Sequence, residues 1–379
     1  MASSISLISG SPLIGCPIVY SVQPEDYAAN RTFHRIIVRV YAKLETDADY
    51  TTFDFSTPVE TKPSNQSFVT VESTFDISSA LQAVADKYEY EANPTFPKRY
   101  PYIKFRVEAW DEWMIDGVVY PDQNLVNWPF NNNPSYDFYG YAFMGAFNDM
   151  ERMGALIDGQ GVEYLNLTYL SRKPTTSPEV VFKDIPFIYP VAFNPARSIG
   201  DTDAMSGNNF VSGAPSNGPK SESSTQTTIG LATVGGRGIY VIEKPANGYE
   251  LRFINGIGVM ESVHVKAFAN KEVNIHTEKY TIARRETLKK FSRAMTVKTD
   301  DYETWTLTSG PLDEAWASWF VHDFLKAQVM WIAIVRNSTT TWLPCHVLPE
   351  ETTMLRDSEK ASMMSVRFKV QLDINGSVR

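Results

Sequence analysis

Polar and apolar residues alternate along much of this chain, which predicts a protein built mainly of β-strands. Residues 102–110 follow a period of two without interruption, and residues 33–44 do so nearly as regularly. A period of two places successive side chains on opposite faces of a sheet. The prolines at residues 180–192 indicate an edge strand or connector. We expect further strands at residues 17–22, 68–71, 118–120, 239–242, 249–254, 259–265, 272–283, 295–307, 329–335, 342–348 and 364–374.

The pattern changes to a helical period at two places. One amphipathic helix is predicted after Asp76, a residue type that caps helix N-termini. Its apolar face contains Ile77, Leu81, Val84, Ala85 and Tyr88. A second helix is predicted at residues 312–327, with Pro311 at its first position and Lys326 in its last turn. A short third helix is expected around residues 143–153. The wide apolar face of the second helix contains Leu312, Trp316, Trp319, Phe320, Phe324 and Leu325.

Two short glycine-rich segments mark tight turns. Asn255-Gly256 supplies the positive backbone angles that a tight hairpin requires. Residues 235–238 lack the Lys-Ser/Thr pair of a phosphate-binding loop, and residues 256–258 lack the third glycine of a dinucleotide site. We therefore interpret both segments as turns.

The length of 379 residues exceeds that of a usual single domain. Residues 201–228 are rich in Ser, Gly, Asn and Thr, which predicts a linker or a long exposed loop. We expect an N-terminal arm at residues 1–15, a β-rich domain at 16–200 and a second β-rich domain at 229–379. The predicted fold is mainly β, with two β-rich domains that each carry one or two flanking helices.

Composition and charge exclude several classes of protein. The chain is 43% hydrophobic and 13% aromatic, which suits large buried cores and not disorder. Its formal charge of −9 argues against general nucleic-acid binding, because phosphate contacts need clustered cations. Cys16 and Cys345 are too few for a disulfide framework, so we expect assembly in a reducing cytoplasm. With no signal segment and no apolar stretch of about 18 residues, we expect a soluble protein without membrane insertion.

Residues that commonly carry catalysis are few and scattered. No two histidines lie at metal-ligand spacing, and we expect His264 and His276 to face outward from strands and His322 to lie on a helix flank. Cys345 and His346 point to opposite faces of a strand, so they cannot act as nucleophile and base. We interpret Cys345 as a small buried apolar residue. The sequence thus predicts no catalytic residue, no cofactor and no metal site. The complete set of histidines is His34, His264, His276, His322 and His346.

One segment, Trp110-Asp111-Glu112-Trp113, places carboxylates between aromatic rings. Glycosidases use paired carboxylates beside rings that stack on sugars. A carbohydrate-binding or glycan-cleaving β-sandwich used in host-surface recognition is therefore the alternative function. Its candidate surface consists of Trp110, Trp113, Trp128, Tyr136 and Tyr139. The interpretation that we favour is a turn between two strands, followed by an aromatic loop at residues 128–141.

A single basic cluster occupies residues 284–293. We interpret it first as a contact with the acidic face of a neighbouring subunit, second as a solvated loop and third as a DNA contact. The candidate subunit-interface residues are Arg284, Arg285, Lys289, Lys290 and Arg293.

Four segments form a recognisable order. They are residues 33–41, the Phe-Asp-Ile-Ser helix start within residues 73–81, the two-strand segment 251–258 and the helix entry 306–310. The last is followed by Trp316, Trp319 and Val329. This order resembles tail and neck-ring structural proteins of crAss-like tailed bacteriophages. Residues 93–200 do not fit the pattern.

The resemblance implies a non-enzymatic virion protein built from two tandem β-sandwich-like domains. It implies assembly in the host cytoplasm into part of a multi-subunit ring in the neck or tail of a tailed phage. It implies a homo-oligomer, which is dodecameric if the ring matches a portal. Its partners would be other neck, tail or portal proteins. DNA would pass through the lumen without specific binding.

Overall fold

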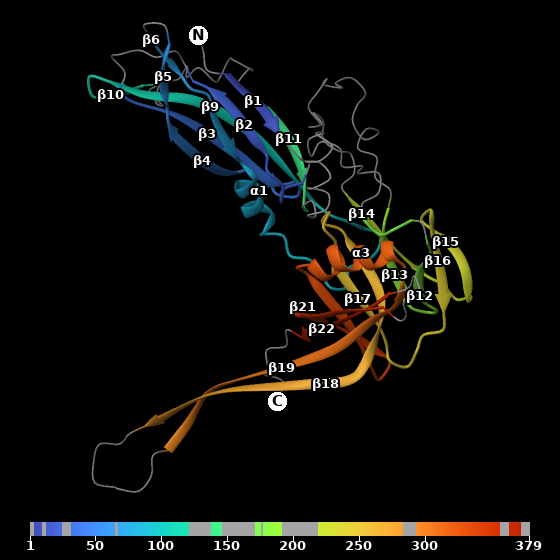
Figure 1. The fold of residues 1–379 in the computed structure, drawn as a ribbon. Helices are drawn as coiled ribbons and strands as arrows, with labels where there is room; N and C mark the ends of the chain where they lie inside the picture. Colours follow the sequence, from blue (N-terminus) through green and yellow to red (C-terminus); the bar gives the residue numbers. More distant parts are fainter. Residues whose placement is uncertain are drawn as a thin grey trace, which may run out of the picture.

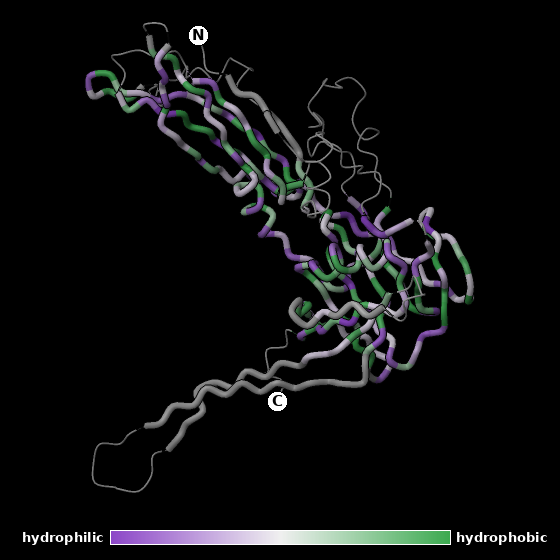
Figure 2. The backbone as a smooth tube through the Cα atoms, viewed as in Figure 1, coloured by the Kyte–Doolittle hydropathy of each residue, from purple (hydrophilic) through white to green (hydrophobic). Residues whose placement is uncertain are grey.

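The computed structural model describes residues 4–9, 13–24, 32–64, 67–120, 138–145, 171–175, 177–191, 219–282, 293–356 and 364–372. These residues are mainly β-structure, as the alternating pattern predicts, and include two α-helices. Figure 1 shows an N-terminal body of sheets, a C-terminal body around a barrel, and a long two-stranded ribbon that leaves the barrel. Figure 2 shows polar and apolar residues alternating along the strands of both bodies.

The first body contains two antiparallel sheets. The first sheet has the order β1 (Ser4–Ser9), β2 (Val19–Gln23) and β7 (Ser73–Asp76). The second has the order β10 (Val118–Tyr120), β9 (Tyr102–Ile115), β3 (Thr32–Leu44) and β4 (Thr51–Pro58). Strand β11 (Phe138–Phe143) also pairs with β9. A separate hairpin joins β5 (Thr61–Ser64) to β6 (Ser67–Thr70).

One apolar core lies between these sheets. Val38 and Val40 of β3 are fully buried, whereas Arg39 between them lies on the opposite face, as a period of two requires. Helix α1 (Ser78–Ala85) packs on the same core through the apolar residues that its period predicted. The Asp76 carboxylate accepts a hydrogen bond from Ser78 N at 3.0 Å, although Ile77 occupies the cap position itself.

The second body is a closed barrel of six antiparallel strands, which does not confirm the expected second sandwich. Its strands, in barrel order, are β17 (Gly248–Ile254), β18 (Met260–Ile282), β19 (Arg293–Leu312), β22 (Met364–Leu372), β21 (Thr339–Arg356) and β20 (Met330–Arg336). Helix α3 (Glu314–His322) and the 3-10 turn η4 (Phe324–Lys326) supply aromatic rings to the barrel core. Phe320 and Phe324 both contact the Phe368 ring of β22.

Two small sheets lie beside the barrel. One has the order β12 (Glu179–Phe182), β16 (Arg237–Ile242) and β15 (Gly230–Val234). The other has the order β13 (Pro186–Pro190), β14 (Lys220–Thr225) and β8 (Lys98–Arg99), so that it joins a strand of the N-terminal half to two later strands. On the outer face of the first sheet, Val180, Tyr240 and Leu231 are register partners in one row, and all three are exposed.

Several local expectations require correction. Pro311 and Leu312 belong to β19, so the helix begins at Glu314, where the Asp313 carboxylate caps it by accepting from Trp316 N at 2.8 Å. The predicted strands at residues 259–265 and 272–283 are one continuous strand. In the second predicted turn the positive φ of 85° falls on Gly258 and not on Asn255-Gly256.

Other boundaries also shift. Strand β14 falls within the predicted linker at residues 201–228, and β1 falls within the predicted arm at residues 1–15, where it pairs with β2 of the same chain. Phe143 ends β11 and does not start a helix, and the rest of the expected helix, apart from residues 144–145, lies outside the described residues. Gly235 and Gly236 form the predicted turn, with φ values of 59° and 78°.

Candidate functional site

The two bodies meet at the turn formed by residues 255–258. Asn255 holds this turn together, because its side-chain oxygen accepts hydrogen bonds from Ile257 N at 3.0 Å and Val259 N at 3.2 Å. Gly258 has a left-handed backbone, and a Cβ there would overlap the carbonyl of Met144 at the end of the first body. Only glycine permits this close approach of two backbones.

An apolar cluster extends this contact. It combines residues of the first body with residues of β13, β17, β18, β20 and the segment between β17 and β18 in a single core: Leu13, Cys16, Tyr100, Tyr102, Phe143, Ile188, Ile254, Ile257, Val259, Met260 and Trp331. The two bodies therefore share buried apolar surface, the main source of rigidity between packed parts.

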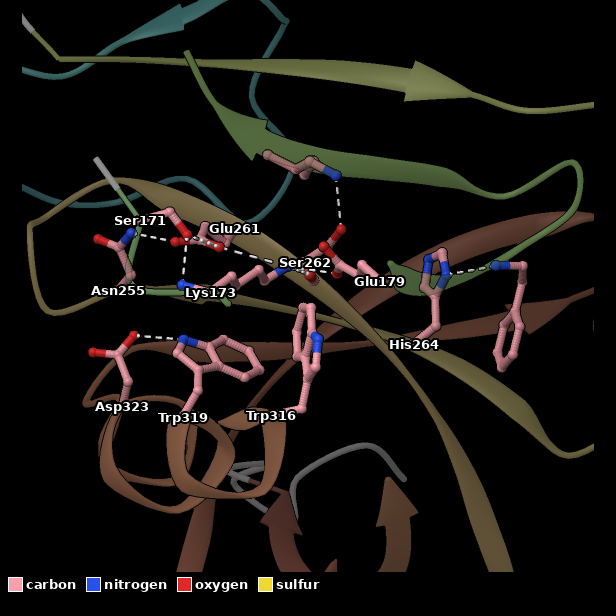
Figure 3. Close-up of polar contacts among 12 residues, drawn as sticks. Ser171, Lys173, Glu179, Asn255, Glu261, Ser262, His264, Trp316, Trp319 and Asp323 are labelled. Atoms are coloured by element: carbon pink, nitrogen blue, oxygen red, sulfur yellow. Dashed lines mark hydrogen bonds and ion pairs between the residues drawn. The ribbon is translucent and has the colours of Figure 1, made fainter. Parts of the chain in front are cut away.

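A buried ion cluster lies beside this junction, between the barrel and the strap, the name used here for residues 171–175 (Figure 3). Lys173 Nζ donates to Glu179 Oε1 and to the Ser262 carbonyl, both at 2.6 Å, and lies 3.5 Å from Glu261 Oε2. The Lys173 side chain is 2% exposed and Glu261 is fully buried. Burial raises the pKa of Glu179, and the nearby Lys173 ammonium opposes that rise.

The neighbouring strap residues complete the cluster. Ser171 Oγ donates to Glu261 Oε2 at 3.0 Å, and the Asn255 amide donates to the other oxygen of the same carboxylate. Arg172 pairs with Asp323 at 3.0 Å, and Trp319 Nε1 donates to the second Asp323 oxygen at 3.2 Å. Burial raises the pKa of Asp323, with Arg172 acting against the rise. The strap is thus tied to β18 and to the end of α3.

His264 is buried, so the expectation that it faces outward is wrong. It lies on β18, where its ring stacks on Phe182 of β12 with centroids 4.8 Å apart. Its Nδ1 accepts a hydrogen bond from Phe182 N at 2.8 Å, which assigns the neutral form with the proton on Nε2. Burial lowers the pKa of His264 to about 3. Its role here is to bind the small sheet to the barrel.

The charges of this cluster are paired within the protein. Each of the buried carboxylates Glu179, Glu261 and Asp323 is engaged by a cation or a donor within the protein. A groove of about 770 Å³ at the junction reaches Arg172 and Asp323, but their charges already face each other. A general acid or base instead needs a reactive partner at hydrogen-bond distance in an accessible site.

The most prominent feature outside the two bodies is the ribbon, defined here as β18 residues 271–282 with β19 residues 293–305 (Figure 1). Strand β17 pairs with β18 only at residues 260–266, and β22 pairs with β19 only at residues 304–312. Among the described residues, no third strand pairs with the ribbon beyond those positions. At a rise of about 3.3 Å per residue, its length is roughly 40 Å.

The candidate glycan surface is not assembled as the sequence suggested. Trp110 is 2% exposed, and it donates through Nε1 to Glu112 Oε1 at 3.3 Å, so it offers no open ring face for a sugar. Glu112 is itself buried and bonded to Arg35 at 2.6 Å. These residues belong to β9, and the turn that we favoured instead lies at residues 116–117.

Of the other aromatic candidates, Trp113 is partly buried, with its ring 5.9 Å from that of His34. Tyr139 lies in β11, whereas Trp128 and Tyr136 lie outside the described residues. In the basic cluster, Arg293 begins β19, opposite Ile282. Arg284, Arg285, Lys289 and Lys290 lie outside the described residues.

Cys345 is buried in the barrel core, which confirms its interpretation as a small apolar residue. His346, beside it on β21, is partly exposed. The strap cluster was missed by sequence reasoning. Glu261 is far from Lys173 and Glu179 in the chain, and the spacing of Lys173 and Glu179 matches no known motif. No local pattern therefore predicts that these residues meet.

Within the described ranges, three or more His, Cys, Asp or Glu residues nowhere gather in a geometry that could hold a metal ion. No helix of the described part of the chain is both long and apolar enough to span a membrane. Comparison with protein-family models found no match, and comparison with curated proteins found no significant similarity.

Proposed function

We propose that this chain is a structural, non-enzymatic component of a multi-subunit ring in the neck or tail of a tailed phage. The observation that carries the proposal is the ribbon, whose outer edges pair with no described strand except at residues 304 and 305, which pair with β22. An isolated two-stranded ribbon is marginally stable in water. Unpaired strand edges also associate readily with other chains. A ribbon of this length therefore suits a protein that works in an assembly.

A ring also requires two different and complementary surfaces on each subunit, because its contacts are head-to-tail. The ribbon supplies one of them. The exposed row of Val180, Tyr240 and Leu231 supplies a second candidate, because contiguous apolar patches commonly mark interaction sites. The shared core between the two bodies suits a rigid wall element. In this proposal the two bodies are tandem β-rich domains, of which the first is sandwich-like.

The proposed assembly is a homo-oligomer, dodecameric where it matches a portal, that contacts other neck, tail or portal proteins. It contributes to the channel or its outer wall, and DNA passes through without specific binding. The chain's formal charge of −9 supports a lumen that does not retain DNA. Subunits assemble in the host cytoplasm, and Arg284, Arg285, Lys289, Lys290 and Arg293 contribute to the contact between them.

The test is a mass measurement combined with electron microscopy of the purified full chain, alone and with an extract of virions. We expect closed rings, or incorporation at the neck or tail of particles. A variant in which Asn-Gly replaces residues 273–303 joins Glu272 to Thr304, which are register partners, and removes the ribbon but keeps the residues that pair with β22. It should keep its thermal unfolding midpoint and lose assembly.

A chain that stays monomeric at all concentrations and is absent from virions would overturn the proposal. In that case a glycan array becomes the next experiment. The variant Trp110→Ala/Trp113→Ala then decides whether the aromatic segment binds sugar.

A further inference from the structure

Charges along the ribbon are segregated by its register. The root, defined as the pairs from Lys271–Trp305 to His276–Asp300, carries four carboxylates and one lysine. The carboxylates belong to Glu272, Asp300, Asp301 and Glu303. The distal part, defined as the pairs from Thr277–Thr299 to Ile282–Arg293, carries three cations and Glu278. Its cations belong to Lys279, Arg293 and Lys298.

The formal charge is therefore −3 at the root and +2 in the distal part, with histidine counted as neutral. The two charged parts are adjacent lengths of one extended ribbon, roughly 40 Å long in total, so one part cannot lie alongside the other within a single copy. The charge of each part is nevertheless complementary to the charge of the other part in a second copy.

We infer that the distal part of each ribbon docks on the root of the ribbon of the next copy in the ring. This inference rests on the proposed function. The contact is head-to-tail, because one copy contributes its basic part and its neighbour contributes its acidic part. Such a contact closes into a ring when the rotation between copies permits. It also orders a two-stranded element that is marginal alone.

A second copy fits this pattern better than DNA does. Phosphate contacts require cations without nearby competing acids, whereas the described ribbon carries five carboxylates against four cations. The acidic root would repel a duplex that lay along the ribbon. The same root attracts the distal part of a neighbouring ribbon, and complementary charge sets the register of such contacts.

Charge reversal tests the contact on the full chain. The distal variant combines Lys279→Glu, Arg293→Glu and Lys298→Glu. The root variant combines Asp300→Lys, Asp301→Lys and Glu303→Lys. Either variant by itself would bring parts of like charge together at the contact between copies. The protein concentration at half-assembly, measured by mass photometry, should therefore rise at least tenfold. Raising the salt to about 1 M should weaken the wild-type assembly, because it shortens the screening length to about 3 Å.

Complementation makes the test specific. The distal variant has two acidic parts and the root variant has two basic parts, so an equimolar mixture should assemble where neither does alone. A chain with both sets of changes should also assemble. The control is Lys62→Glu with Lys87→Glu, which changes two exposed lysines of the first body and should leave assembly unchanged.

The outcomes separate the inference from the proposed function. Wild-type rings that persist in both variants overturn the ribbon contact and leave the ring proposal standing. A wild-type chain that never oligomerises, alone or with virion extract, overturns both. Loss of binding to a short DNA duplex in the distal variant, with assembly intact, assigns the ribbon to DNA and overturns the inference. Restoration in the mixture supports it.

Discussion

Replacing Lys173 by Met tests whether the buried ion cluster holds the strap against the barrel. The Lys173 ammonium contacts Glu179 and the Ser262 carbonyl at 2.6 Å, and it faces Glu261 at 3.5 Å. Met fills a similar length without charge. Glu261 keeps Ser171 as a donor, whereas Glu179 loses its cation while it remains only 11% exposed. Removing one partner of a buried pair destabilises a protein by about 3–5 kcal/mol.

That magnitude is a large part of the roughly 5–15 kcal/mol by which native proteins are stable. The assay is urea unfolding of the full chain, followed by tryptophan fluorescence and circular dichroism. The matched control is Lys183→Met, because Lys183 pairs with Glu243 at 2.9 Å on the surface, where the Glu243 side chain is 67% exposed. Surface pairs contribute about 0–1 kcal/mol, so this control should change little.

The sign of the pH dependence follows from Glu179. Burial already raises its folded-state pKa, and Lys173 opposes that rise. Without Lys173 the folded-state pKa of Glu179 rises further above its unfolded-state pKa. The destabilisation therefore grows as pH rises from the unfolded-state pKa through the folded-state pKa. The loss should therefore be larger at about pH 8 than at about pH 5, and Glu179→Gln in the same background should recover part of it. A loss below about 1 kcal/mol, equal to that of Lys183→Met, would refute the reasoning.

Two further substitutions test the junction and the small sheet. Gly258→Ala places a side chain on a left-handed backbone, which costs about 1–2 kcal/mol, and its Cβ would also overlap the Met144 carbonyl. The control Gly236→Ala has a similar φ but open space around the Cβ. Denaturant unfolding should therefore show a clearly larger loss of stability for Gly258→Ala. Equal losses would contradict the close backbone contact. His264→Asn keeps an acceptor for Phe182 N but does not titrate. The folded-state pKa of His264 is about 3, below its ordinary value of 6.5. The contribution of neutral His264 to folding stability is therefore complete above about pH 6.5 and is lost as pH falls toward 3, by about 1.4 kcal/mol for each pH unit. The stability advantage of wild type over His264→Asn should shrink over this range, and a constant difference would exclude a neutral buried His264.

The sequence by itself determined where the most regular strands lie, because alternation is a local consequence of the two faces of a sheet, whereas strands such as β4 and β14 were not predicted. Residues 33–44 and 102–110 were predicted as strands and form β3 and most of β9. The glycine pair at residues 235–236 was predicted as a turn and forms one, because few other residues accept two successive positive φ values. Cys345 was predicted to be buried and packs in the barrel core.

Only the tertiary structure decided how these elements combine. Closure of six strands into a barrel depends on pairing between residues far apart in the chain, such as β17 with β20, and local periodicity carries no information about it. For the same reason, His264 was wrongly expected to face outward, because its outer face is covered by β12, a strand some 80 residues earlier. Lys173 and Glu261 likewise meet only after the strap packs on β18. The residues of the ribbon were predicted as two separate strands. That they form a projecting ribbon depends on tertiary structure, because β18 and β19 continue past the strands that flank them in the barrel.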